Sequence, residues 1–456
     1  MDRLMVGVSG VRGMVGGSLT PRVACDFACA FGTMLGAGRT AVVARDSRAS
    51  GPMLRNAVVG GLLATGVNVV DLGLVSTPAA ALMTARLGAD GGAVITASHN
   101  PAEYNGMKFL RPTGTPLAAV DAERLKRIWQ SGRFALADHA GQGAESSNPG
   151  AAAAYVEAVC ETCDVAAVSR RGFKVALDGA NGAGCTASRM LLGRLGCELI
   201  HLNDRPDGRF AHPPEPVEEN LSELMGAVRS SGAEVGFAQD ADADRLAIVD
   251  EAGRFIGEEY TLALAAAFTF RCRKGPVATN LSTSRMVDDL AAAAGCKVVR
   301  APTGEANVVD AMVREGCILG GEGGGGVIDP RVVPVRNSLS GMAMVLQYMA
   351  ETRKTVGELV AEIPRYVMIK TKLPCPAGSA EKVVARARQA FAGREAARLN
   401  DADGLRVDLP DRWVSVRASN TEPILRIIAE APRQADAEAL VAEMRTIAEP
   451  AIAADE

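Results

Sequence analysis

The sequence predicts an α/β protein built from repeated units and followed by an α+β segment at its C-terminal end. Three observations predict this class. Strand-like and helix-like runs alternate through most of the chain, a pattern typical of sheets joined by crossover helices. The alternation starts again near Ala151 and near Ile256. From about Tyr366, consecutive strand-like runs stand between two helix-like runs, which favours an antiparallel sheet.

The first unit shows both kinds of run. Short runs rich in Val and Ile predict buried strands, and longer runs rich in Ala and Leu predict helices. The expected strands cover 40–46, 67–73 and 91–98, and the expected helices cover 52–66 and 77–88.

The second and third units repeat this alternation. Residues 66–83 align without a gap with residues 295–312, so that Met83 falls on Met312, and this match indicates a repeated α/β unit. The expected strands are 173–179, 197–203, 234–240, 275–280, 296–302 and 317–322. The expected helices are 151–161, 187–196, 220–232, 258–270, 284–295 and 305–316.

The last unit has a different order. After a strand near Tyr366, a helix is expected over 380–393 and a second over 435–449. Between them lie the expected strands 404–410, 413–419 and 424–431.

Composition excludes several classes of protein. The 456 residues carry 49 Lys and Arg against 53 Asp and Glu, a net charge of −4, with no basic block, so nucleic-acid binding has no electrostatic support. The apolar run Leu262 to Phe270 is far shorter than the ~20 residues that span a bilayer. The first residues lack the apolar core of a signal peptide. We therefore expect a cytoplasmic protein without membrane or nucleic-acid partners, whose ten cysteines are thiols.

The segment TASHNPAEYNGMKF, residues 96–109, carries the strongest chemical signal. It follows a predicted strand, where α/β folds place ligand loops. The hydroxyl of Ser98 is able to accept a phosphoryl group, and His99 and Lys108 supply a proton carrier and a positive charge. A polar turn punctuated by Asn-Pro is the alternative.

The segment DADADR, residues 240–245, also follows a predicted strand. Its alternating carboxylates Asp240, Asp242 and Asp244 are able to converge on one divalent cation. A calcium EF-hand loop requires glycine where Arg245 stands, so Mg²⁺ fits better, and Arg245 is placed to contact the same phosphate. A solvated acidic loop is the alternative.

Three further loops suit anions less specifically. Arg12, Arg45 and Arg48 lie in loops of small residues, where guanidinium groups bind anions or form surface ion pairs. The stretch DGANGAG, 178–184, is either a backbone anion site before a helix or a structural turn.

Two late motifs complete the set. GGEGGGGVI, 320–328, lacks the Lys-Ser/Thr of a nucleotide P-loop, and Glu322 is its polar side chain, suited to sugar hydroxyls. RASNTEPILR, 417–426, places two arginines around Ser419, Asn420 and Thr421, which is either a cradle for a phosphate dianion or a hairpin turn.

Two separate phosphate positions suit a bisphosphorylated species held at both ends. In this order the motifs resemble those of the α-D-phosphohexomutase superfamily, which includes phosphoglucomutases, phosphomannomutases and phosphoglucosamine mutases. TASHNP resembles its phosphoserine loop, DADADR its metal loop, GEGGGG its sugar-binding loop and RASNTEP its phosphate-binding loop. The stretch HPPEPVEENL, 212–221, resembles the segment before its metal loop.

The resemblance implies three similar mixed-sheet α/β domains and a C-terminal α+β domain around a central cleft. The implied domains are 1–150 with the phosphoserine loop, 151–255 with the metal loop, 256–365 with the sugar-binding loop and 366–456 with the phosphate-binding loop.

The resemblance also implies the reaction. Phosphorylated Ser98 would donate to a hexose phosphate of glucosamine, mannose or glucose, passing through a hexose 1,6-bisphosphate that also serves as activator. Mg²⁺ would lie on the three aspartates and the Ser98 phosphate, and the protein would be a monomer or a homodimer with sugar phosphates as its ligands. The implied site residues near the transferred group are Arg12, His99, Lys108 and Arg245, with Glu322 and Gly324 at the sugar and Arg417, Ser419, Asn420, Thr421 and Arg426 at the second phosphate.

The chain departs from many bacterial members in its sugar loop. Those members have GExSGH, where this chain has Gly324 and Gly326, and they have a lysine near Thr303 where this chain has Pro302. The loop resembles the GEGNGG branch, whose members are assigned to several sugars. A non-catalytic sugar-phosphate-binding protein and a sugar phosphatase are the alternative functions on the same fold.

Overall fold

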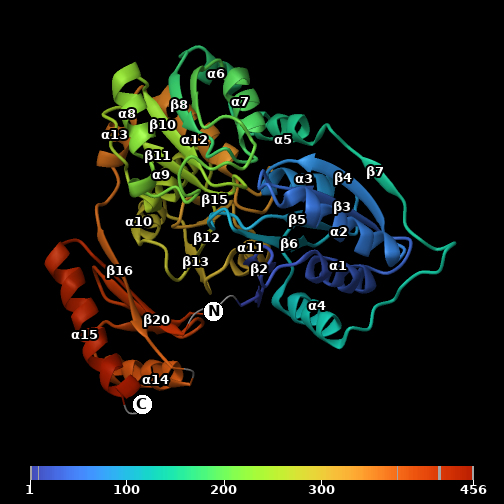
Figure 1. Ribbon diagram of the computed structural model, residues 1–456. Coiled ribbons are helices and arrows are strands. Elements are labelled where there is room, and N and C mark those ends of the chain that lie inside the picture. The colour runs from blue at the N-terminus through green and yellow to red at the C-terminus, as the bar shows by residue number, and fades with distance from the viewer. Residues whose placement is uncertain (1–2, 9, 377, 420–422, 454–456) are drawn as a thin grey trace.

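The structure, a computed structural model, describes residues 3–8, 10–376, 378–419 and 423–453 (Figure 1). The described chain forms four sheets, in the strand orders β1-β2-β6-β5-β3-β4-β7, β11-β10-β8-β9, β13-β12-β14-β15 and β16-β20-β19-β18-β17. The first three are mixed sheets with helices, and the fourth is antiparallel throughout. The fold class predicted from the sequence is confirmed.

The first sheet belongs to the N-terminal unit. Helix α1 begins after Thr20, whose side chain accepts a hydrogen bond from the Val23 N–H and so satisfies one of the free donors of the first turn. The elements of this unit are β1 (Met5–Gly7), β2 (Gly10–Met14), α1 (Pro21–Leu35), β3 (Thr40–Arg45), α2 (Gly51–Ala64), β4 (Asn68–Leu74), α3 (Thr77–Arg86), β5 (Gly91–Ile95), β6 (Tyr104–Leu110), α4 (Ala119–Ser131) and β7 (Glu145–Ser147).

The second and third sheets repeat this plan on a smaller scale. The second unit contains α5 (Ala151–Cys160), α6 (Val165–Ser169), β8 (Lys174–Asp178), α7 (Cys185–Arg194), β9 (Glu198–Leu202), α8 (Ser222–Ser231), β10 (Val235–Gln239) and β11 (Leu246–Val249). The third contains α9 (Glu258–Cys272), β12 (Val277–Asn280), α10 (Met286–Ala293), β13 (Val298–Ala301), α11 (Glu305–Glu315), β14 (Leu319–Glu322), β15 (Gly326–Ile328), α12 (Ser338–Thr352) and α13 (Val356–Ala361).

The internal repeat is visible in the elements themselves. Residues 66–83 contain β4 and the start of α3, and residues 295–312 contain β13 and most of α11, so the gap-free alignment matches strand to strand and helix to helix. The repeat inferred from the sequence is therefore confirmed for this pair.

The same turn recurs in all three units and positions the site. Strand β5 runs parallel to β3 and is followed by the antiparallel strand β6; β10 and β14 are likewise followed by antiparallel β11 and β15. The loops between these strand pairs hold Ser98, the three aspartates and the glycine-rich run. The returning strands, two of which have only three or four residues, were missed by the sequence analysis because short buried runs have no clear period.

The C-terminal unit packs two helices against its sheet. It comprises β16 (Val367–Pro374), α14 (Ser379–Ala392), β17 (Arg398–Asn400), β18 (Leu405–Asp408), β19 (Trp413–Ala418), β20 (Ile424–Ala431) and α15 (Gln434–Ala453). The antiparallel sheet expected here is confirmed.

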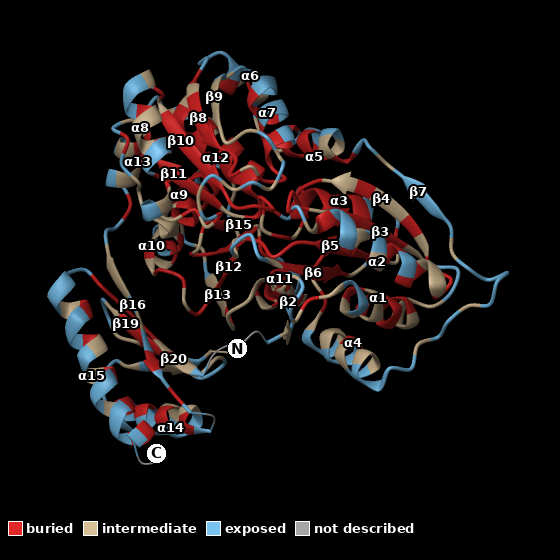
Figure 2. Ribbon diagram, in the orientation of Figure 1, coloured by how far each residue is buried: buried red, intermediate tan, exposed pale blue. Residues whose placement is uncertain are grey.

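The cores divide the molecule into two parts. One cluster of buried apolar side chains runs through elements of the first three units, whereas the last unit has a core of its own (Figure 2). Polar contacts join the two parts: Arg406 Nη1 donates to the Leu281 carbonyl at 2.6 Å, and the Thr303 N–H donates to Asp403 Oδ2 at 3.0 Å. Within the described residues, no helix is both long and apolar enough to cross a membrane.

Candidate active site

Ser98 is fully buried on the loop between β5 and β6. Its Oγ donates a hydrogen bond to Asp240 Oδ2 at 2.7 Å. Its backbone has φ +51°, a left-handed conformation that costs a non-glycine residue energy and persists only where the surroundings enforce it. The Thr96 hydroxyl accepts the Ser98 N–H at 2.9 Å and so helps to hold this turn.

Arg48 fixes the serine loop from behind. Its side chain is 1% exposed and pairs with Asp46, which is also buried. Its Nη1 and Nη2 groups donate to four backbone carbonyls of the loop and its exit, those of Pro101, Tyr104, Ser98 and Asn100. Because its donors are used by the protein itself, the prediction that Arg48 binds an anion is wrong; Arg48 supports the loop instead.

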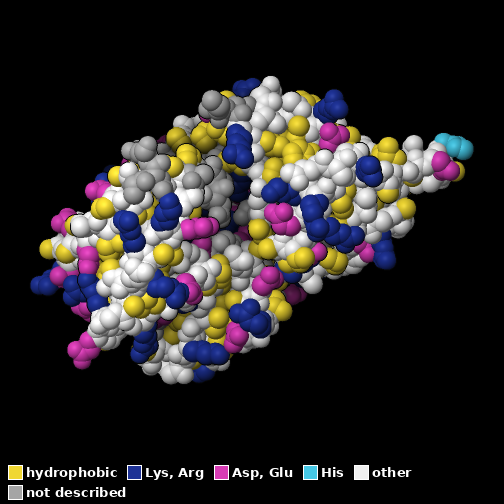
Figure 3. Space-filling model, turned by 90° about the horizontal axis from the view of Figure 1, so that it is seen from below, with side chains coloured by type: hydrophobic (Ala, Val, Ile, Leu, Met, Phe, Trp, Pro, Cys, Tyr) yellow, Lys and Arg dark blue, Asp and Glu magenta, His cyan; other side chains and the backbone are white. Residues whose placement is uncertain are grey.

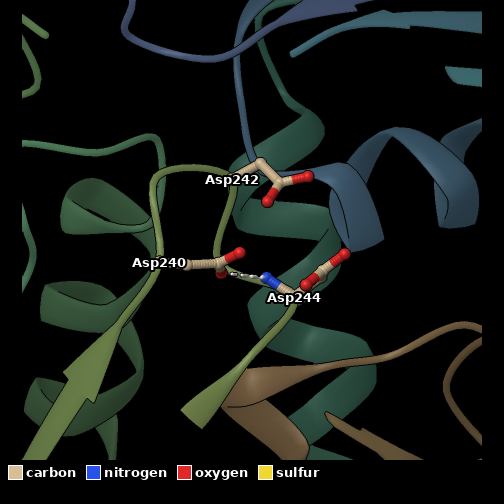
Figure 4. A group of neighbouring side chains, drawn as sticks. All are labelled: Asp240, Asp242 and Asp244. Atoms are coloured by element: carbon tan, nitrogen blue, oxygen red, sulfur yellow. Dashed lines mark hydrogen bonds between the residues drawn. The ribbon is translucent and has the colours of Figure 1, made fainter. Parts of the chain in front are cut away.

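The three aspartates converge in the loop between β10 and β11 (Figure 4). Each offers a carboxylate oxygen, and these oxygens lie within 4.8 Å of one another. Asp240 Oδ1 accepts the N–H groups of Asp244 and Arg245, both at 3.1 Å, which closes the loop on itself. The sequence pattern therefore brings all three carboxylates to one point.

Two cations share the negative charge of the triad. Lys108 Nζ on β6 donates to Asp242 Oδ2 at 2.6 Å and to Asp244 Oδ2 at 2.8 Å, and Arg336 Nη2 donates to Asp244 Oδ2 at 2.8 Å. Burial raises the pKa of Asp244, but Arg336 and Lys108 outweigh it and hold that pKa well below its ordinary value. Burial, together with the two neighbouring carboxylates, instead raises the pKa of Asp240.

The triad fits a divalent cation. Within the described part of the chain, Asp242 Oδ1 and Asp244 Oδ1 are buried and have no hydrogen-bond partner. An unpaired buried carboxylate oxygen is costly, and a hard cation is the partner that such oxygens prefer.

The alternative of an EF-hand is excluded by the same loop. Glu251, at the twelfth position of such a loop, faces away: its oxygens accept from the Thr355 hydroxyl at 2.7 Å and the Gly357 N–H at 3.0 Å. The flanking elements are strands, not helices.

Two further predicted residues of the transfer site, Arg12 and His99, contact the Ser98 loop. Arg12, on β2, donates to Asn100 Oδ1 at 3.0 Å. His99 Nδ1 lies 3.4 Å from Ser98 Oγ, and burial, together with the positive charges of Arg245 and Arg12, lowers the pKa of His99 to about 2. The imidazole is therefore neutral at ordinary pH.

The glycine-rich turn between β14 and β15 presents Glu322 beside this site. Glu322 Oε1 accepts from Asn280 Nδ2 at 2.8 Å and from the Gly304 N–H at 3.2 Å. A Cβ built on Gly324 would meet only Arg245 Nη1 at 3.7 Å and Glu258 Oε2 at 3.9 Å, ordinary contact distances. A side chain at position 324 could therefore begin there without a clash.

The last unit contributes a row of cations. Lys372, Arg426 and Arg417 stand directly opposite one another on β16, β20 and β19. Directly opposite residues project from the same face of a sheet, and like charges there repel one another. Asp403 Oδ2, 4.0 Å from Arg417 Nε, offsets part of this positive charge. Ser419 directly follows β19, and Asn420 and Thr421 lie outside the described residues.

The structure also distinguishes between the two interpretations of the stretch 178–184, an anion site and a structural turn. A Cβ on Gly182 would lie 2.7 Å from the Ala241 carbonyl oxygen, and one on Gly184 would lie 2.7 Å from Ala243 Cβ. The stretch is therefore a close-packed structural turn that supports the metal loop.

Several side chains of the site were missed by the sequence analysis. They are Thr77, whose hydroxyl donates to Asp242 Oδ2 at 2.5 Å, together with Arg336, Lys372 and Asn280. None lies in a motif, and only the meeting of distant segments reveals them.

A transfer within one substrate needs a nucleophile, counter-charges for the moving group and a second anion site that keeps the substrate bound. A hollow near the centre of the molecule has basic and acidic side chains in it (Figure 3). The Ser98 hydroxyl, the cations beside the triad and the row of cations on the last sheet are the groups available for these three tasks. The fold and site thus define an intramolecular phosphotransferase.

Comparison with known proteins agrees with this class. Models of phosphoglucomutase/phosphomannomutase alpha/beta/alpha domains I, II and III match residues 3–135, 153–253 and 257–366, and the model of the C-terminal domain matches 368–447. The chain belongs to the phosphoglucomutase/phosphomannomutase family of the α-D-phosphohexomutase superfamily, and it is a phosphohexomutase.

Relatives cover nearly the whole chain. A phosphoglucomutase/phosphomannomutase of Thermococcus kodakarensis is 40% identical over 433 residues, 94% of each chain. A probable phosphoglucosamine mutase of Methanopyrus kandleri is 38% identical over 432 residues, 93% of each. The crystal structure of a phosphoglucomutase/phosphomannomutase family protein from Burkholderia thailandensis superposes with a TM-score of 0.86 at 29% identity, covering 98% of each chain.

Proposed function

We propose that this protein interconverts hexose 1-phosphates and hexose 6-phosphates through phosphorylated Ser98, with a hexose 1,6-bisphosphate as intermediate and activator. One observation carries the proposal: Ser98 Oγ lies 2.7 Å from a carboxylate of the acidic triad, whose other two carboxylates are contacted by Lys108 and Arg336. A phosphoryl group on this oxygen would meet the charges that its transfer requires.

Residues of this chain handle the proton and the negative charge of the phosphoryl transfer. A hydroxyl oxygen of the hexose phosphate attacks the phosphorus, the bond from phosphorus to Ser98 Oγ breaks, and its electron pair remains on Oγ. The hydroxyl proton is replaced on Ser98 Oγ through His99, whose Nδ1 lies 3.4 Å from that oxygen. The imidazole stays neutral because it releases a proton from Nδ1 to Oγ while it accepts one at Nε2. Arg12, Lys108 and Arg245 offset the charge on the phosphoryl oxygens. The bisphosphate then turns over, and its other phosphoryl group returns to Ser98 by the reverse steps.

We propose Mg²⁺ as the ion of the triad, held by Asp240, Asp242, Asp244 and an oxygen of the Ser98 phosphate. The two buried carboxylate oxygens that have no hydrogen-bond partner among the described residues support this assignment. When bound, Mg²⁺ supplies positive charge to the phosphoryl oxygens and orients them.

We propose that the phosphate group that does not react binds to the C-terminal unit. Arg417 and Arg426, with Lys372 beside them, would bind the dianion that does not react, together with Ser419, Asn420 and Thr421. The like charges aligned across β16, β20 and β19 support this assignment. A site that retains the bisphosphate favours a mutase over a phosphatase, which gains nothing from such retention.

Glu322 would accept hydrogen bonds from sugar hydroxyls, and the space above Gly324 would admit more than one sugar. We propose phosphates of glucosamine, mannose and glucose as substrates. The relatives' names, phosphoglucomutase/phosphomannomutase and probable phosphoglucosamine mutase, support this range.

The test is direct. The protein, Mg²⁺ and a trace of glucose 1,6-bisphosphate are incubated with the 1-phosphate of glucosamine, mannose, glucose or N-acetylglucosamine, and phosphorus NMR monitors the 6-phosphates. We expect conversion of at least one of the first three. Release of inorganic phosphate instead would establish a phosphatase, and no conversion of any sugar by a protein phosphorylated at Ser98 would favour a binding protein.

A further inference from the structure

Arg336 connects the metal loop to the sugar loop. Its Nη2 donates to Asp244 Oδ2 at 2.8 Å, and its Nη1 donates to Glu322 Oε2 at 3.0 Å. The side chain is 12% exposed, and both carboxylates are buried. One guanidinium group thus touches a residue of the cation triad and a residue of the sugar turn at the same time.

The glycine turn makes room for this side chain. A Cβ on Gly326 would lie 2.3 Å from Arg336 Cδ and 2.8 Å from its Cγ, closer than real atoms approach. The stem of Arg336 therefore lies where any side chain at position 326 would begin. A histidine at this position, as in GExSGH loops, and Arg336 in this conformation exclude each other.

A third carboxylate fixes the base of Arg336. Glu305, at the start of α11, accepts a hydrogen bond from the backbone N–H of Arg336 at 2.6 Å. Its other carboxylate oxygen lies 3.6 Å from Arg336 Nε. The guanidinium group is therefore oriented at its stem and at both of its tips. Held in this way, it orients the carboxylates that it touches rather than following them.

We propose that Arg336 is a positioning residue with two opposite effects: it orients Glu322 for the sugar, and its positive charge on Asp244 opposes the binding of the metal ion. The inference rests on the proposed role of Glu322. Arg336 donates to only one oxygen of Glu322, and the second lone pair of that oxygen remains for a sugar hydroxyl. On Asp244, the same positive charge opposes a divalent cation.

Because Arg336 has these two effects, replacing it should change the sugar-phosphate affinity and the metal affinity in opposite directions. Removing the guanidinium group with Arg336→Gln weakens sugar-phosphate binding by about tenfold, since a hydrogen bond to a charged group is lost. It also tightens metal binding by about threefold or more, since a competing charge is removed from the triad. A general disturbance of the fold would weaken both.

The two affinities are measured separately by calorimetry. Glucose 1,6-bisphosphate is titrated in EDTA into variants that also carry Ser98→Ala, which prevents transfer. Mn²⁺ and Mg²⁺ are titrated without sugar into metal-stripped protein with Ser98 intact. Arg336→Lys keeps the charge but reaches only one carboxylate, so we expect weaker sugar binding with unchanged metal affinity. It also serves if Arg336→Gln does not fold.

The matched control is Arg331→Lys. Arg331 lies in the same segment and also pairs with a buried carboxylate, Asp329, and it donates to the Thr162 carbonyl rather than to any residue of the proposed site. Both of its affinities should equal those of the parent protein. Equal affinities in Arg336→Gln, or a parallel loss of both, would overturn the inference.

Glu322→Gln separates this inference from the proposed function. If Glu322→Gln leaves sugar-phosphate affinity unchanged, the proposed sugar contact is wrong, and the part of the inference that concerns Glu322 falls with it. If Glu322→Gln weakens sugar binding and Arg336→Gln does not, the proposed function stands and the inference fails.

Discussion

Ser98 Oγ and Asp240 Oδ2 lie 2.7 Å apart although 142 positions separate these residues in the chain. One comes from the turn after β5 and the other from the turn after β10, so the nucleophile and the triad belong to different sheets. The hydrophobic core that runs through the first three units holds these sheets together. The geometry of transfer therefore depends on how the units pack, not on any one loop.

Replacing the nucleophile tests the phosphoserine. Ser98→Ala should lower mutase turnover by about a thousandfold or more, because no other group in the proposal accepts the phosphoryl. Glucose 1,6-bisphosphate should still bind. The control is Ser47→Ala, which removes another buried hydroxyl, one without a hydrogen-bond partner among the described residues. Coupled-assay kinetics and intact mass measure both, and a Ser98→Ala protein with full turnover would refute the assignment.

The roles of the three aspartates and of Thr77, which contacts Asp242, can be tested separately. Asp242→Ala should lower the rate and the metal affinity together, and activity that survives EDTA in the parent protein would contradict a metal role. Thr77→Val removes the hydroxyl that donates to Asp242 Oδ2, and we expect about tenfold weaker metal binding, as for other groups that orient a ligand. Thr77→Ser keeps the hydroxyl and should bind metal normally. Calorimetric titration of metal-stripped protein checks each variant.

Replacing Arg48 should lower the stability of the folded protein. Arg48→Met leaves the buried Asp46 carboxylate without its partner and four loop carbonyls without donors, so we expect a loss of about 3–5 kcal/mol in the free energy of unfolding. The double variant Asp46→Asn with Arg48→Met removes both charges and should be less destabilised than the single one. Urea unfolding compares them. An unchanged unfolding midpoint in Arg48→Met would show that the loop does not need this residue.

Two glycines of the sugar turn should respond differently. Gly324→Ser meets only ordinary contacts, so its stability should stay within about 0.5 kcal/mol while its preference among sugars shifts. Gly326→Ala collides with Arg336 and should destabilise the protein by about 1–3 kcal/mol. Thermal unfolding and kcat/KM over the sugar panel measure the pair. Equal stability of the two variants would mean that Arg336 does not occupy this space.

Glu259 should make stability depend on pH. Burial raises the pKa of its carboxyl from 4.5 to about 7, although Lys370 and the Ser284 N–H favour the charged form. The folded state therefore keeps a proton that the unfolded state releases, so the stability that this group contributes below pH 4.5 is lost as pH rises to about 7. Glu259→Gln should flatten this part of the thermal profile. Glu258→Gln, which also loses a contact with Lys370, should keep the slope of the parent protein.

Much of the site was predictable because its chemistry is local in sequence. Ser98 with His99, and the three aspartates at alternating positions, combine residue types that have few other uses directly after a strand. The strands before these loops were predicted, and the structure contains them. The returning strands and helix α12, where every residue from Ser338 to Leu346 is buried, were not predicted, because a run that is buried all round has no polar face to give it a period.

The sequence by itself determined the α/β class, the repeated units and the order of the loops, since these follow from local patterns of apolar residues, glycine and charge. Only the tertiary structure decided which charges meet. It turned Arg48 inward to the Ser98 loop, brought Thr77 and Lys108 to Asp242, and placed Arg336 between Asp244 and Glu322. Most of these contacts join segments that are far apart in the chain, and their distances are set by the packing of the core, which no local pattern encodes.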